Sequence, residues 1–490
     1  MENNKSNINR HFKEPCNEGE IPDPDSSGIS RTSSSSDFVK FTANITGNII
    51  SDIKFKASGC SYTKASAGCL TTLIKNRDIL NSTLTNEKDI EDCLGNFPSG
   101  KKYIPGMAID ALRKLITNYI SNPLTPEIYK IDNNRIAVAL SGGIDSSMAA
   151  KILKEKGYRV IGVTLKLLPD NFSRLKKTKT GTYEEDIKSA IKVSARLGIP
   201  HVVIDFTELF EDKIIRPFCL DYKKGLTPNP CVECNKYIKF GALLEKIKVL
   251  GAAFLATGHY CIIKKSSDSG LYEIQKSTDK KKDQSYILWK LNQKQLSHIK
   301  TPLGTITKTD MRKAVKKSFP FLKNARESQD ICFIPDKDYR LFLKSRINDI
   351  GKGPILDTGG NIIGKHSGYV YYTIGQRKGL GVSRSRPLYV KEIIPEKNII
   401  IAGYKEDIFN KFLKVKNTNF ISGKPPGRTF RAMVKIRYSS KEAPASIIIT
   451  GTGTADIIFD KSQKAVTPGQ SAVFYDDFKL IGGGIIKKIN

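Results

Sequence analysis

Two short stretches of this sequence combine residue types whose spacing could do chemistry. The first is Ser141-Gly-Gly-Ile-Asp-Ser146, where two adjacent glycines lie between hydroxyl side chains. Gly142 and Gly143 allow a tight turn whose N–H groups converge on an anion, and the start of a helix would add its dipole. Asp145 would repel a phosphate, so we expect it to hold the Mg²⁺ that accompanies one. The stretch predicts a nucleotide site, although a Gly-Gly turn also occurs without any ligand.

The second stretch is Asn229-Pro-Cys-Val-Glu-Cys234, a Cys-x-x-Cys pair in front of a predicted helix. Lys236 and Lys239 follow on the first face of that helix, and a thiol beside lysines at a helix start is expected to have a stabilised thiolate. Such a pair could be a nucleophile, a redox pair or half of a zinc site. No second Cys-x-x-Cys completes a zinc site, and Cys332 supplies a further candidate thiol.

Alternating strands and helices would position the first stretch. Residues 136–140 form a wholly apolar run, as expected for a parallel strand covered on both faces, and residues 148–154 continue at helical spacing. Further strand patterns at 158–165 and 201–205 are separated by a helical pattern at 185–197. This alternation predicts a doubly wound parallel sheet with its ligand at the carboxyl ends of the strands.

Length and charge set the scale of the protein and the nature of its partners. The chain has 490 residues, enough for three or four domains, and a formal net charge of +31. Residues 1–120 hold 15 Lys and Arg against 14 Asp and Glu, so the rest of the chain holds 65 against 35. This basic part predicts a polyanionic partner, and a solvated lysine-rich surface is the alternative interpretation.

The sequence gives no indication of a membrane span or a signal peptide. It has no run of about 18 apolar residues, and its first thirty residues are polar. We therefore expect a cytoplasmic protein without a membrane partner. Its nine cysteines are better explained as thiols for catalysis or metal binding than as a disulfide framework.

The first 120 residues form a module of their own. Residues 1–36 are polar and are expected to be flexible. Alternating strands begin at Asp37, helical patterns follow at 65–80 and 107–120, and prolines near the start of residues 122–132 predict a linker.

Several further motifs, in order along the chain from about Asn133 to the end, carry a resemblance to a known family. They are Thr257-Gly-His-Tyr260, Lys282-Asp-Gln-Ser-Tyr286, Ser328-Gln-Asp-Ile-Cys-Phe333, Gly364-Lys-His-Ser-Gly-Tyr369 and Pro468-Gly-Gln-Ser471. Together with the two stretches above, this part of the chain resembles the tRNA-uridine 2-sulfurtransferases (MnmA family). Those enzymes belong to the ATP pyrophosphatases that carry a pyrophosphate (PP) loop.

The resemblance implies ATP-dependent 2-thiolation of the wobble uridine of tRNA, through adenylation of its C2 oxygen and replacement of that oxygen by sulfur. ATP and Mg²⁺ would be required, the acceptors would be the tRNAs for Lys, Glu and Gln, and a cysteine desulfurase or sulfur carrier would be the donor. By resemblance Cys234 is the catalytic nucleophile and Cys332 carries a persulfide. Cys231, Cys234 and Cys332 could instead hold a [4Fe-4S] cluster with one open iron, and the sequence does not choose between the two.

The resemblance also implies two sets of binding residues. The ATP site would comprise Ala139, Leu140, Ser141, Gly142, Gly143, Ile144, Asp145, Ser146, Leu165 and Gly258. The tRNA would contact Asn229, Pro230, Cys231, His259, Lys282, Asp283, Gln284, Arg437, Tyr438 and Gln470.

Residues 8–120 resemble the IscU/NifU type of iron–sulfur scaffold, above all through Gly59-Cys-Ser-Tyr-Thr-Lys-Ala-Ser-Ala-Gly68. Such scaffolds hold a cluster with three cysteines, and by this resemblance only Cys60 remains. The other two positions fall near Ser35 and at Tyr103 or Ile104. Cys16, Cys69 and Cys93 lie elsewhere, with Cys69 expected in the core. A sulfur relay at Cys60, a docking role or an inert packing module all stay open.

The expected fold is a multidomain α/β protein with six segments. They are a flexible segment (1–36), an α+β scaffold-like module (37–121), a linker (122–132), a doubly wound PP-loop domain (133–340), a small central β-domain (341–405) and a C-terminal RNA-binding β-barrel (406–490). One rival function is another PP-loop activity on a small substrate, which needs neither the barrel nor paired thiols. The other is an iron–sulfur scaffold or carrier, or a combined sulfur-relay and thiolation protein.

Overall fold

The structure is a computed structural model that describes residues 8, 10–32, 36–169, 172, 183–322, 331–334 and 338–488. Its contacts divide the chain into two compact units. The first comprises the chain up to Pro169 with residues 183–206 and 244–258, and the second comprises residues 207–243 and 259–490. The predicted position near Ser35 and the motif residues 328–330 lie outside the described residues.

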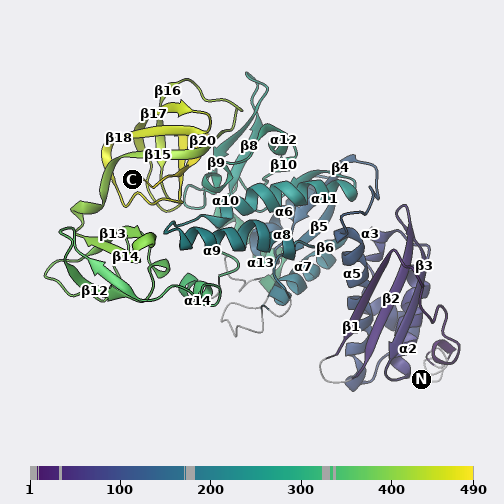
Figure 1. Ribbon diagram of the computed structural model, residues 1–490. Helices are drawn as coiled ribbons and strands as arrows, with labels where there is room; N and C mark the ends of the chain where they lie inside the picture. Colours follow the sequence, from purple (N-terminus) through teal and green to yellow (C-terminus); the bar gives the residue numbers. More distant parts are fainter. Residues whose placement is uncertain are drawn as a thin grey trace. The chain divides into compact units, whose positions relative to one another are not determined.

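The first unit begins with an antiparallel sheet in the order β1-β2-β3, which lies beside helices α2 and α5 (Figure 1). Phe41 and Phe55, at alternating positions of β2 and β3, are fully buried, as expected for a sheet with one face covered by helices. The elements are β1 (Ser26–Arg31), β2 (Phe38–Thr46), β3 (Ile49–Ser58), α2 (Ser61–Ile74), α3 (Ile79–Ser82), α4 (Glu87–Leu94), η1 (Ser99–Lys101) and α5 (Tyr103–Ser121).

The prediction that residues 1–36 are a flexible segment is wrong for Ser26–Arg31, which form β1 and pair with β2. The polar side chains of this strand are satisfied by helix α5, since Ser26 Oγ donates to the Leu115 carbonyl at 2.8 Å. Gly28 permits the close approach, because a Cβ there would lie 2.3 Å from the Ala111 carbonyl oxygen. A prediction from composition assumes that serines face solvent. It therefore misses a strand whose serine hydroxyls bond to a neighbouring helix.

Two helices of this module differ from the sequence-based prediction. The helix expected at 65–80 begins four residues earlier, at Ser61, and ends at Ile74. Asn76 adopts a φ of +60°, which turns the chain away from a helical path. Helix α4 was not predicted, and its start carries a capping box in which Asn86 and Asp89 bond to each other's backbone N–H groups.

The remainder of the first unit is a parallel sheet in which β4 lies between β7 and β5, and β5 pairs with β6. Ile136, Ala137 and Val138 of β4 are fully buried, as a strand covered on both faces requires. The predicted doubly wound α/β fold is thereby confirmed. The elements are β4 (Asp132–Ala139), α6 (Ile144–Glu155), β5 (Arg159–Lys166), α7 (Tyr183–Leu197), β6 (His201–Asp205), α11 (Leu243–Val249) and β7 (Ala252–Ala256).

The N-terminal module packs against β6 of this sheet through the end of α5. Ser121 Oγ accepts a hydrogen bond from the Asp205 backbone N–H at 2.9 Å, and Thr83 Oγ1 accepts one from the His201 N–H at 3.1 Å. Both donors belong to backbone of β6 that the β5 pairing leaves unused. The module therefore completes the hydrogen bonding of this strand.

The segment predicted to be a linker is held in place by the same unit. Lys246 donates to the Asn122 carbonyl at 2.7 Å, and the Ile128 N–H donates to the Val249 carbonyl at 3.1 Å. Residues 122–132 therefore run along the catalytic domain and do not form a free tether.

The second unit contains helical segments, a small central sheet and a barrel. Its helical segments are α8 (Thr207–Phe210), η3 (Glu211–Ile215), α9 (Arg216–Lys223), α10 (Pro230–Cys234), η4 (Asn235–Ala242), η5 (Ser285–Leu288), α12 (Gln293–Leu296), α13 (Lys308–Ser318), η6 (Pro320–Leu322) and α14 (Tyr339–Lys344). Further short helices are η8 (Tyr369–Tyr371), η9 (Pro395–Lys397) and η10 (Glu406–Ile408), and a short strand is β10 (Ile299–Lys300). The central sheet has the order β12-β11-β14-β13, from β11 (Gly353–Leu356), β12 (Ile362–His366), β13 (Tyr389–Ile394) and β14 (Ile399–Gly403).

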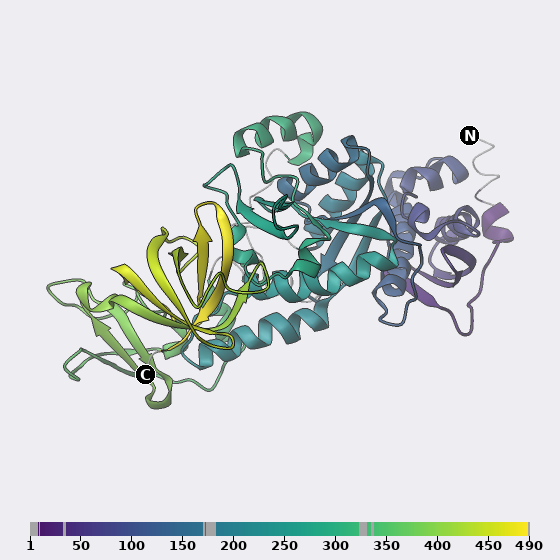
Figure 2. The same ribbon diagram turned by 90° about the horizontal axis from the view of Figure 1, so that it is seen from above.

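The C-terminal strands form a closed barrel, because β15 pairs with both β18 and β20 (Figure 2). Leu413, Val434, Ile447, Ile457 and Phe474 fill its interior. A hairpin of β8 (Cys261–Lys265) and β9 (Tyr272–Lys276) extends the barrel sheet beyond β20. The barrel strands are β15 (Phe409–Phe420), β16 (Thr429–Lys435), β17 (Ala443–Gly451), β18 (Thr454–Lys464), β19 (Ser471–Asp476) and β20 (Lys479–Ile486). The predicted multidomain fold class is confirmed.

Candidate active site

The glycine loop lies at the point of the parallel sheet where the order of the strands along the chain reverses. The chain proceeds from β4 outward to β5 and β6 and then returns to β7 on the other side of β4. In such sheets the loops that follow the two central strands run in opposite directions, and they leave a crevice for a ligand outside the carboxyl ends of these strands. The loop at 141–146 follows β4, and Gly258 follows β7. A Cβ on Gly258 would lie 2.8 Å from the Ser146 backbone nitrogen, so only glycine allows the two chain segments to approach this closely.

Hydroxyl groups hold the loop in shape. Ser146 Oγ accepts from the Ser141 N–H at 3.1 Å and donates to the Gly143 carbonyl at 3.2 Å, while Ser147 Oγ donates to the same carbonyl at 2.7 Å. Gly143 is the N-cap of α6 in extended conformation and has no side chain to cap the helix. The N-terminus of this 12-residue helix adjoins the loop and carries the positive end of the helix dipole, which favours an anion.

Helix α7 supports the loop from behind and brings in a carboxyl group that the sequence analysis missed. Gly142 has a φ of +72°, and a Cβ there would lie 2.3 Å from the Asp186 carbonyl oxygen. Ser189 Oγ donates to the Gly142 carbonyl at 2.8 Å. The Asp186 side chain is exposed, yet desolvation by the surrounding protein, and then the nearby charge of Glu185, raise its pKa to about 6. No motif marks Asp186, and only the packing of α7 on the loop identifies it.

Of the ten residues predicted for the ATP site, the structure places 139–146 in one continuous segment, from the end of β4 through the loop into the first turn of α6, with Gly258 beside it. Leu165 is half-buried at the end of β5, paired with Ile204. Asp145 lies in the first turn of α6, where its carboxylate is suited to holding the Mg²⁺ that accompanies ATP.

A buried histidine links the loop to the contact with the N-terminal module. His201 Nε2 lies 2.8 Å from Thr164 Oγ1, which donates to the carbonyl of Leu140, the residue before the loop. Burial, and then the charge of Arg113 from α5, lower the pKa of His201 to about 3. His201 is therefore neutral at physiological pH. Its ring holds the Thr164 hydroxyl in place, and that hydroxyl bonds to the residue before the loop.

In the second unit, three thiols lie close enough for their charges to interact. Cys231 and Cys234 belong to α10, and Cys332 lies in the described segment 331–334. Cys234 is buried, Cys231 half-buried and Cys332 exposed. Thiolates at Cys234 and Cys231 would raise the pKa of Cys332, and the Lys239 ammonium acts in the opposite sense on all three.

The expectation that these thiols are stabilised as thiolates is wrong for this structure. Desolvation outweighs the Lys239 charge, raising the pKa of Cys231, that of Cys234 to about 11 and that of Cys332 to about 12. Although the Cys332 side chain is exposed to solvent, desolvation is the largest cause of its pKa shift as well. The sequence revealed the lysines but not how much protein surrounds the thiols.

An aromatic cluster anchors the segment that carries Cys332. Phe333 contacts Phe210, Phe218 and Phe342, with ring centroids 5.7, 5.2 and 5.2 Å away. These edge-on and tilted contacts fix the backbone next to the thiol. Cys332 therefore has an exposed side chain, while the residue next to it is held by aromatic packing.

Asn235, directly after Cys234, is a further residue that sequence reasoning did not select. Its side chain is 1% exposed, its amide nitrogen donates to the Ile287 carbonyl at 3.2 Å, and its Oδ1 has no hydrogen-bond partner. A buried, unpaired amide oxygen costs free energy, so it marks a place where a ligand group could bind.

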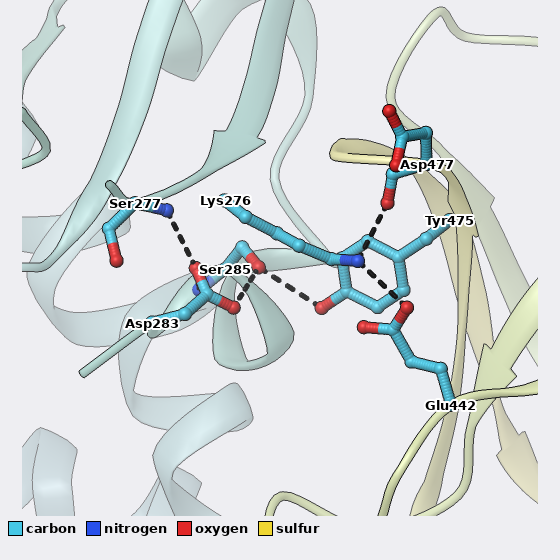
Figure 3. A network of polar contacts seen from close by, with 7 residues as sticks. All are labelled: Lys276, Ser277, Asp283, Ser285, Glu442, Tyr475 and Asp477. Atoms are coloured by element: carbon cyan, nitrogen blue, oxygen red, sulfur yellow. Dashed lines mark hydrogen bonds and ion pairs between the residues drawn. The ribbon is translucent and has the colours of Figure 1, made fainter. Parts of the chain in front are cut away.

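The predicted tRNA-contacting residues of the 282–284 motif are used inside the protein. Figure 3 shows the Asp283 carboxylate accepting from the Ser277 N–H at 3.1 Å and from Ser285 Oγ at 2.7 Å, while Ser285 Oγ lies 3.1 Å from the Tyr475 hydroxyl of the barrel. Gln284 exchanges hydrogen bonds with the Tyr260 backbone at 2.8 and 3.0 Å. These side chains join the motif to the barrel, and Lys282 lies half-buried beside them.

The predicted tRNA contacts from the barrel also make internal hydrogen bonds. Gln470 Nε2 donates to the Thr227 and Pro228 carbonyls at 2.9 and 3.3 Å and so supports the loop before α10. Arg437 donates to the Ile374 and Ala465 carbonyls at 2.9 and 2.7 Å. Their polar atoms hold the thiol-bearing loop and the central domain against the barrel.

The remaining predicted tRNA contacts differ in exposure. Tyr438 is 45% exposed, with the Lys435 ammonium 5.5 Å from its ring centroid, although its hydroxyl donates to the Asp283 carbonyl at 3.2 Å. His259 is buried against Phe240, and burial, then the charge of Lys239, hold its pKa well below the usual value. Asn229 and Pro230 lie at the N-cap and first position of α10.

In the N-terminal module, Cys60 is the one cysteine that matches a predicted ligand position of the iron–sulfur scaffolds. Cys60 is the N-cap of α2. Burial alone would raise its pKa, but hydrogen bonds from Thr63, Lys101 and the Tyr62 N–H together lower it. Tyr103 is one of the two positions, with Ile104, predicted to replace a scaffold cysteine, and its hydroxyl donates to Asp37 at 2.8 Å.

Within the described ranges, no group of three or more His, Cys, Asp or Glu side chains is arranged to hold a metal ion. The three thiols of the second unit are therefore not arranged as a metal ligand set in the described structure. None of the helices in the described part of the chain is both long and apolar enough to cross a membrane.

The parallel sheet with a glycine loop at its switch point defines a nucleotide-binding α/β enzyme. A family model described as the tRNA methyl transferase HUP domain matches residues 134–336. The models of the tRNA methyl transferase PRC-barrel domain and the aminomethyltransferase β-barrel domain match 340–404 and 410–486. The model of the NifU-like N-terminal domain matches residues 3–125.

Curated relatives identify the family. A tRNA-specific 2-thiouridylase MnmA of Caldanaerobacter subterraneus subsp. tengcongensis is 47% identical over 358 residues, which is 73% of this chain and 98% of the relative. That of Clostridioides difficile is 43% identical over 73% of this chain and 99% of the relative. The chain therefore belongs to the MnmA family of tRNA-specific 2-thiouridylases, with a NifU-like domain at its N-terminus. A solved NifU-like protein from Brucella abortus also matches 23% of this chain and 91% of its own, at 12% identity and a TM-score of 0.20.

Proposed function

We propose that this protein replaces the C2 oxygen of the wobble uridine in tRNA by sulfur, at the expense of ATP. The observation that carries the proposal is the gathering of three thiols around one lysine, Lys239, in a chain whose other unit holds a nucleotide loop. A PP-loop enzyme acting on a small substrate would need no such thiols. The relatives named as tRNA-specific 2-thiouridylases support the assignment.

In the first step the uridine C2 oxygen attacks the α-phosphorus of ATP. An O–P bond forms, the bond to the β-phosphate breaks, and pyrophosphate leaves from the loop at 141–146. Asp145 would hold the Mg²⁺ that neutralises the leaving group, and the loop amides would bind its oxygens. The C2 oxygen is now part of an AMP leaving group.

In the second step sulfur replaces that oxygen. We assign the incoming sulfur to a persulfide on Cys332, the exposed thiol. The Cys234 thiolate attacks the inner sulfur, a disulfide forms between Cys234 and Cys332, and the hydrosulfide released adds to C2 and expels AMP. Because both thiols are protonated in the free protein, the reaction requires a base or a change of environment when tRNA binds.

The polyanionic substrate fits the charge of the second half of the chain. We propose that Tyr438, exposed and flanked by Lys435, offers a surface on which a base can stack. Asp283, Gln284, Arg437 and Gln470 would act by holding this surface and the α10 loop in place. The acceptors would be the tRNAs for Lys, Glu and Gln.

We propose a sulfur-relay role for the N-terminal module on one specific observation, the lowered pKa of Cys60 at the start of α2. A more acidic, partly exposed thiol can accept sulfur from a cysteine desulfurase. The Tyr103–Asp37 hydrogen bond disfavours a cluster at the same position, since a phenol is a poor ligand for such sites.

Reconstitution with unmodified tRNA, ATP, Mg²⁺ and sulfide tests the proposal. We expect 2-thiouridine at the wobble position, dependent on ATP, with one AMP and one pyrophosphate released per sulfur inserted. Incorporation without ATP, or ATP cleavage that tRNA does not stimulate, would overturn it.

A further inference from the structure

The N-terminal module contains a second thiol site, apart from Cys60, formed where helices α2 and α4 pack together. Cys69 of α2 is fully buried, and Cys93 of α4 is partly exposed. The two thiols form a hydrogen bond with each other. His11 Nε2 lies 4.0 Å from the Cys93 sulfur.

The surroundings give the two thiols different chemistry. The hydrogen bond from Cys69 lowers the pKa of Cys93, against the effect of burial. The same hydrogen bond, then burial and the charge of Asp89, raise the pKa of Cys69. Burial and the charge of Arg10 lower the pKa of His11, so its ring is neutral and can accept a proton. One thiol is an accessible nucleophile, and the other is a protonated partner directly behind it.

We propose that Cys93 and Cys69 form a sulfane-sulfur reducing site, which takes a sulfur atom from a persulfide or polysulfide and releases it as hydrosulfide. This rests on the proposed function only in that hydrosulfide is the form of sulfur consumed by thiolation. The site differs from Cys60, which could hold and hand on a persulfide but has no hydrogen-bonded second thiol among the groups that set its pKa.

The reaction balances as two thiol exchanges. The Cys93 thiolate attacks the terminal sulfur of the donor, the donor's S–S bond breaks, and the donor leaves as a thiolate. Cys69 then attacks the Cys93 sulfur and gives up its proton, a Cys69–Cys93 disulfide forms, and hydrosulfide leaves with the electron pair of the broken S–S bond. A dithiol reductant returns the disulfide to two thiols with two electrons and two protons.

The test uses the full chain with inorganic polysulfide, without tRNA or ATP, and peptide mass spectrometry after rapid alkylation. In wild type we expect a Cys69–Cys93 disulfide and release of hydrosulfide that a dithiol reductant makes catalytic. In Cys69→Ala we expect a persulfide trapped on Cys93, and in Cys93→Ser at least a tenfold loss of catalytic hydrosulfide release. Cys16→Ser, which removes an exposed thiol of the same module, should behave as wild type.

Alkylation kinetics provide a second readout that a purely structural cysteine pair would not give. The alkylation rate at Cys93 should rise through a midpoint below the usual pKa of a thiol, and that midpoint should move upward in Cys69→Ala because the stabilising hydrogen bond is lost. The proposal is overturned if Cys93 takes up sulfur no faster than Cys16, or if hydrosulfide release is the same in Cys93→Ser. Thiolation with free sulfide is measured separately, so its failure would contradict the proposed function and leave this test unaffected.

Discussion

At the scale of residues, the proposed chemistry uses thiols whose surroundings oppose their reactivity. Cys234 and Cys332 have raised pKa values because desolvation exceeds the effect of Lys239. Thiols that are protonated at neutral pH resist alkylation and oxidation, which protects a sulfur carrier between turnovers. The sequence motifs predict that these cysteines act together, which stays a prediction, and the balance between charge and desolvation depends on packing that no motif contains.

Replacing either thiol should separate the two chemical steps. Cys234→Ser and Cys332→Ser are expected to abolish 2-thiouridine formation from a persulfide donor while pyrophosphate release stimulated by tRNA stays within a few-fold of wild type. The activating step uses no thiol, which is why it should survive. Pyrophosphate and nucleoside analysis on the same samples measure both quantities, with Cys261→Ser, a buried cysteine remote from α10 in sequence, as the control. Equal loss of both activities would refute the assignment.

Lys239 should control the acidity of the cluster. Its charge lowers the pKa of all three thiols, so Lys239→Gln should raise the pKa of Cys234 beyond about 11. At pH 9 we expect alkylation of Cys234 to slow by roughly three- to tenfold, which corresponds to up to about one pKa unit. Lys236→Gln, on the same helical segment, is the matched control. An unchanged alkylation rate in Lys239→Gln would show that the charge does not reach the thiol.

At the scale of elements, the sequence predicted most of what periodicity encodes. The strands at β4, β5 and β6, the helix after the glycine loop and the closed barrel follow from apolar patterns and turn spacing. Strand β1 was missed because its serines bond to α5. Helix α4 was missed because it has only eight residues, too few to show a clear apolar period, although a capping box marks its start. The role of Asp283, Arg437 and Gln470 in joining motifs to the barrel depends on contacts between residues far apart in sequence.

His201 should make the first unit sensitive to acid. Its pKa of about 3 in the folded state lies below the ordinary histidine value of 6.5, so the unfolded chain binds the proton more readily. The stabilising contribution is complete above pH 6.5 and is lost as the pH falls toward 3. Between pH 6.5 and pH 5 the loss is about 2 kcal/mol, from about 1.4 kcal/mol per pH unit.

Thermal unfolding of wild type, His201→Gln and the partly exposed control His298→Gln between pH 7 and pH 5 measures this effect. The wild type and the control should lose stability in parallel, and His201→Gln should lose less over the same range. A parallel decline in all three would mean that His201 is not the titrating group.

At the scale of the molecule, the N-terminal module is a structural partner of the catalytic sheet as well as a carrier of thiols. Ser121 and Thr83 accept hydrogen bonds from the backbone of β6, and Lys246 bonds to the end of α5. A strand edge without such partners is prone to pair with other chains. The connection at 122–132 therefore works as part of the fold and not only as a tether.

Removing the module should consequently harm the catalytic domain itself. We expect a fragment of residues 133–490 to aggregate more and to unfold at a lower temperature than the full chain. In the full chain, Ser121→Ala should speed exchange of the Asp205 amide hydrogen, while Thr117→Ala on the same helix should not. A fragment as soluble and stable as the full chain, with unchanged exchange in Ser121→Ala, would reduce the module to an appendage.

The most direct test of the central claim follows the oxygen that sulfur replaces. A tRNA whose wobble uridine carries ¹⁸O at C2 is allowed a single turnover with the protein, ATP, Mg²⁺ and sulfide, and the AMP is analysed by mass spectrometry. If the C2 oxygen attacks the α-phosphorus, the phosphate of AMP must carry one ¹⁸O atom for each 2-thiouridine formed. Thiolation that leaves the label in water or in inorganic phosphate would contradict the account.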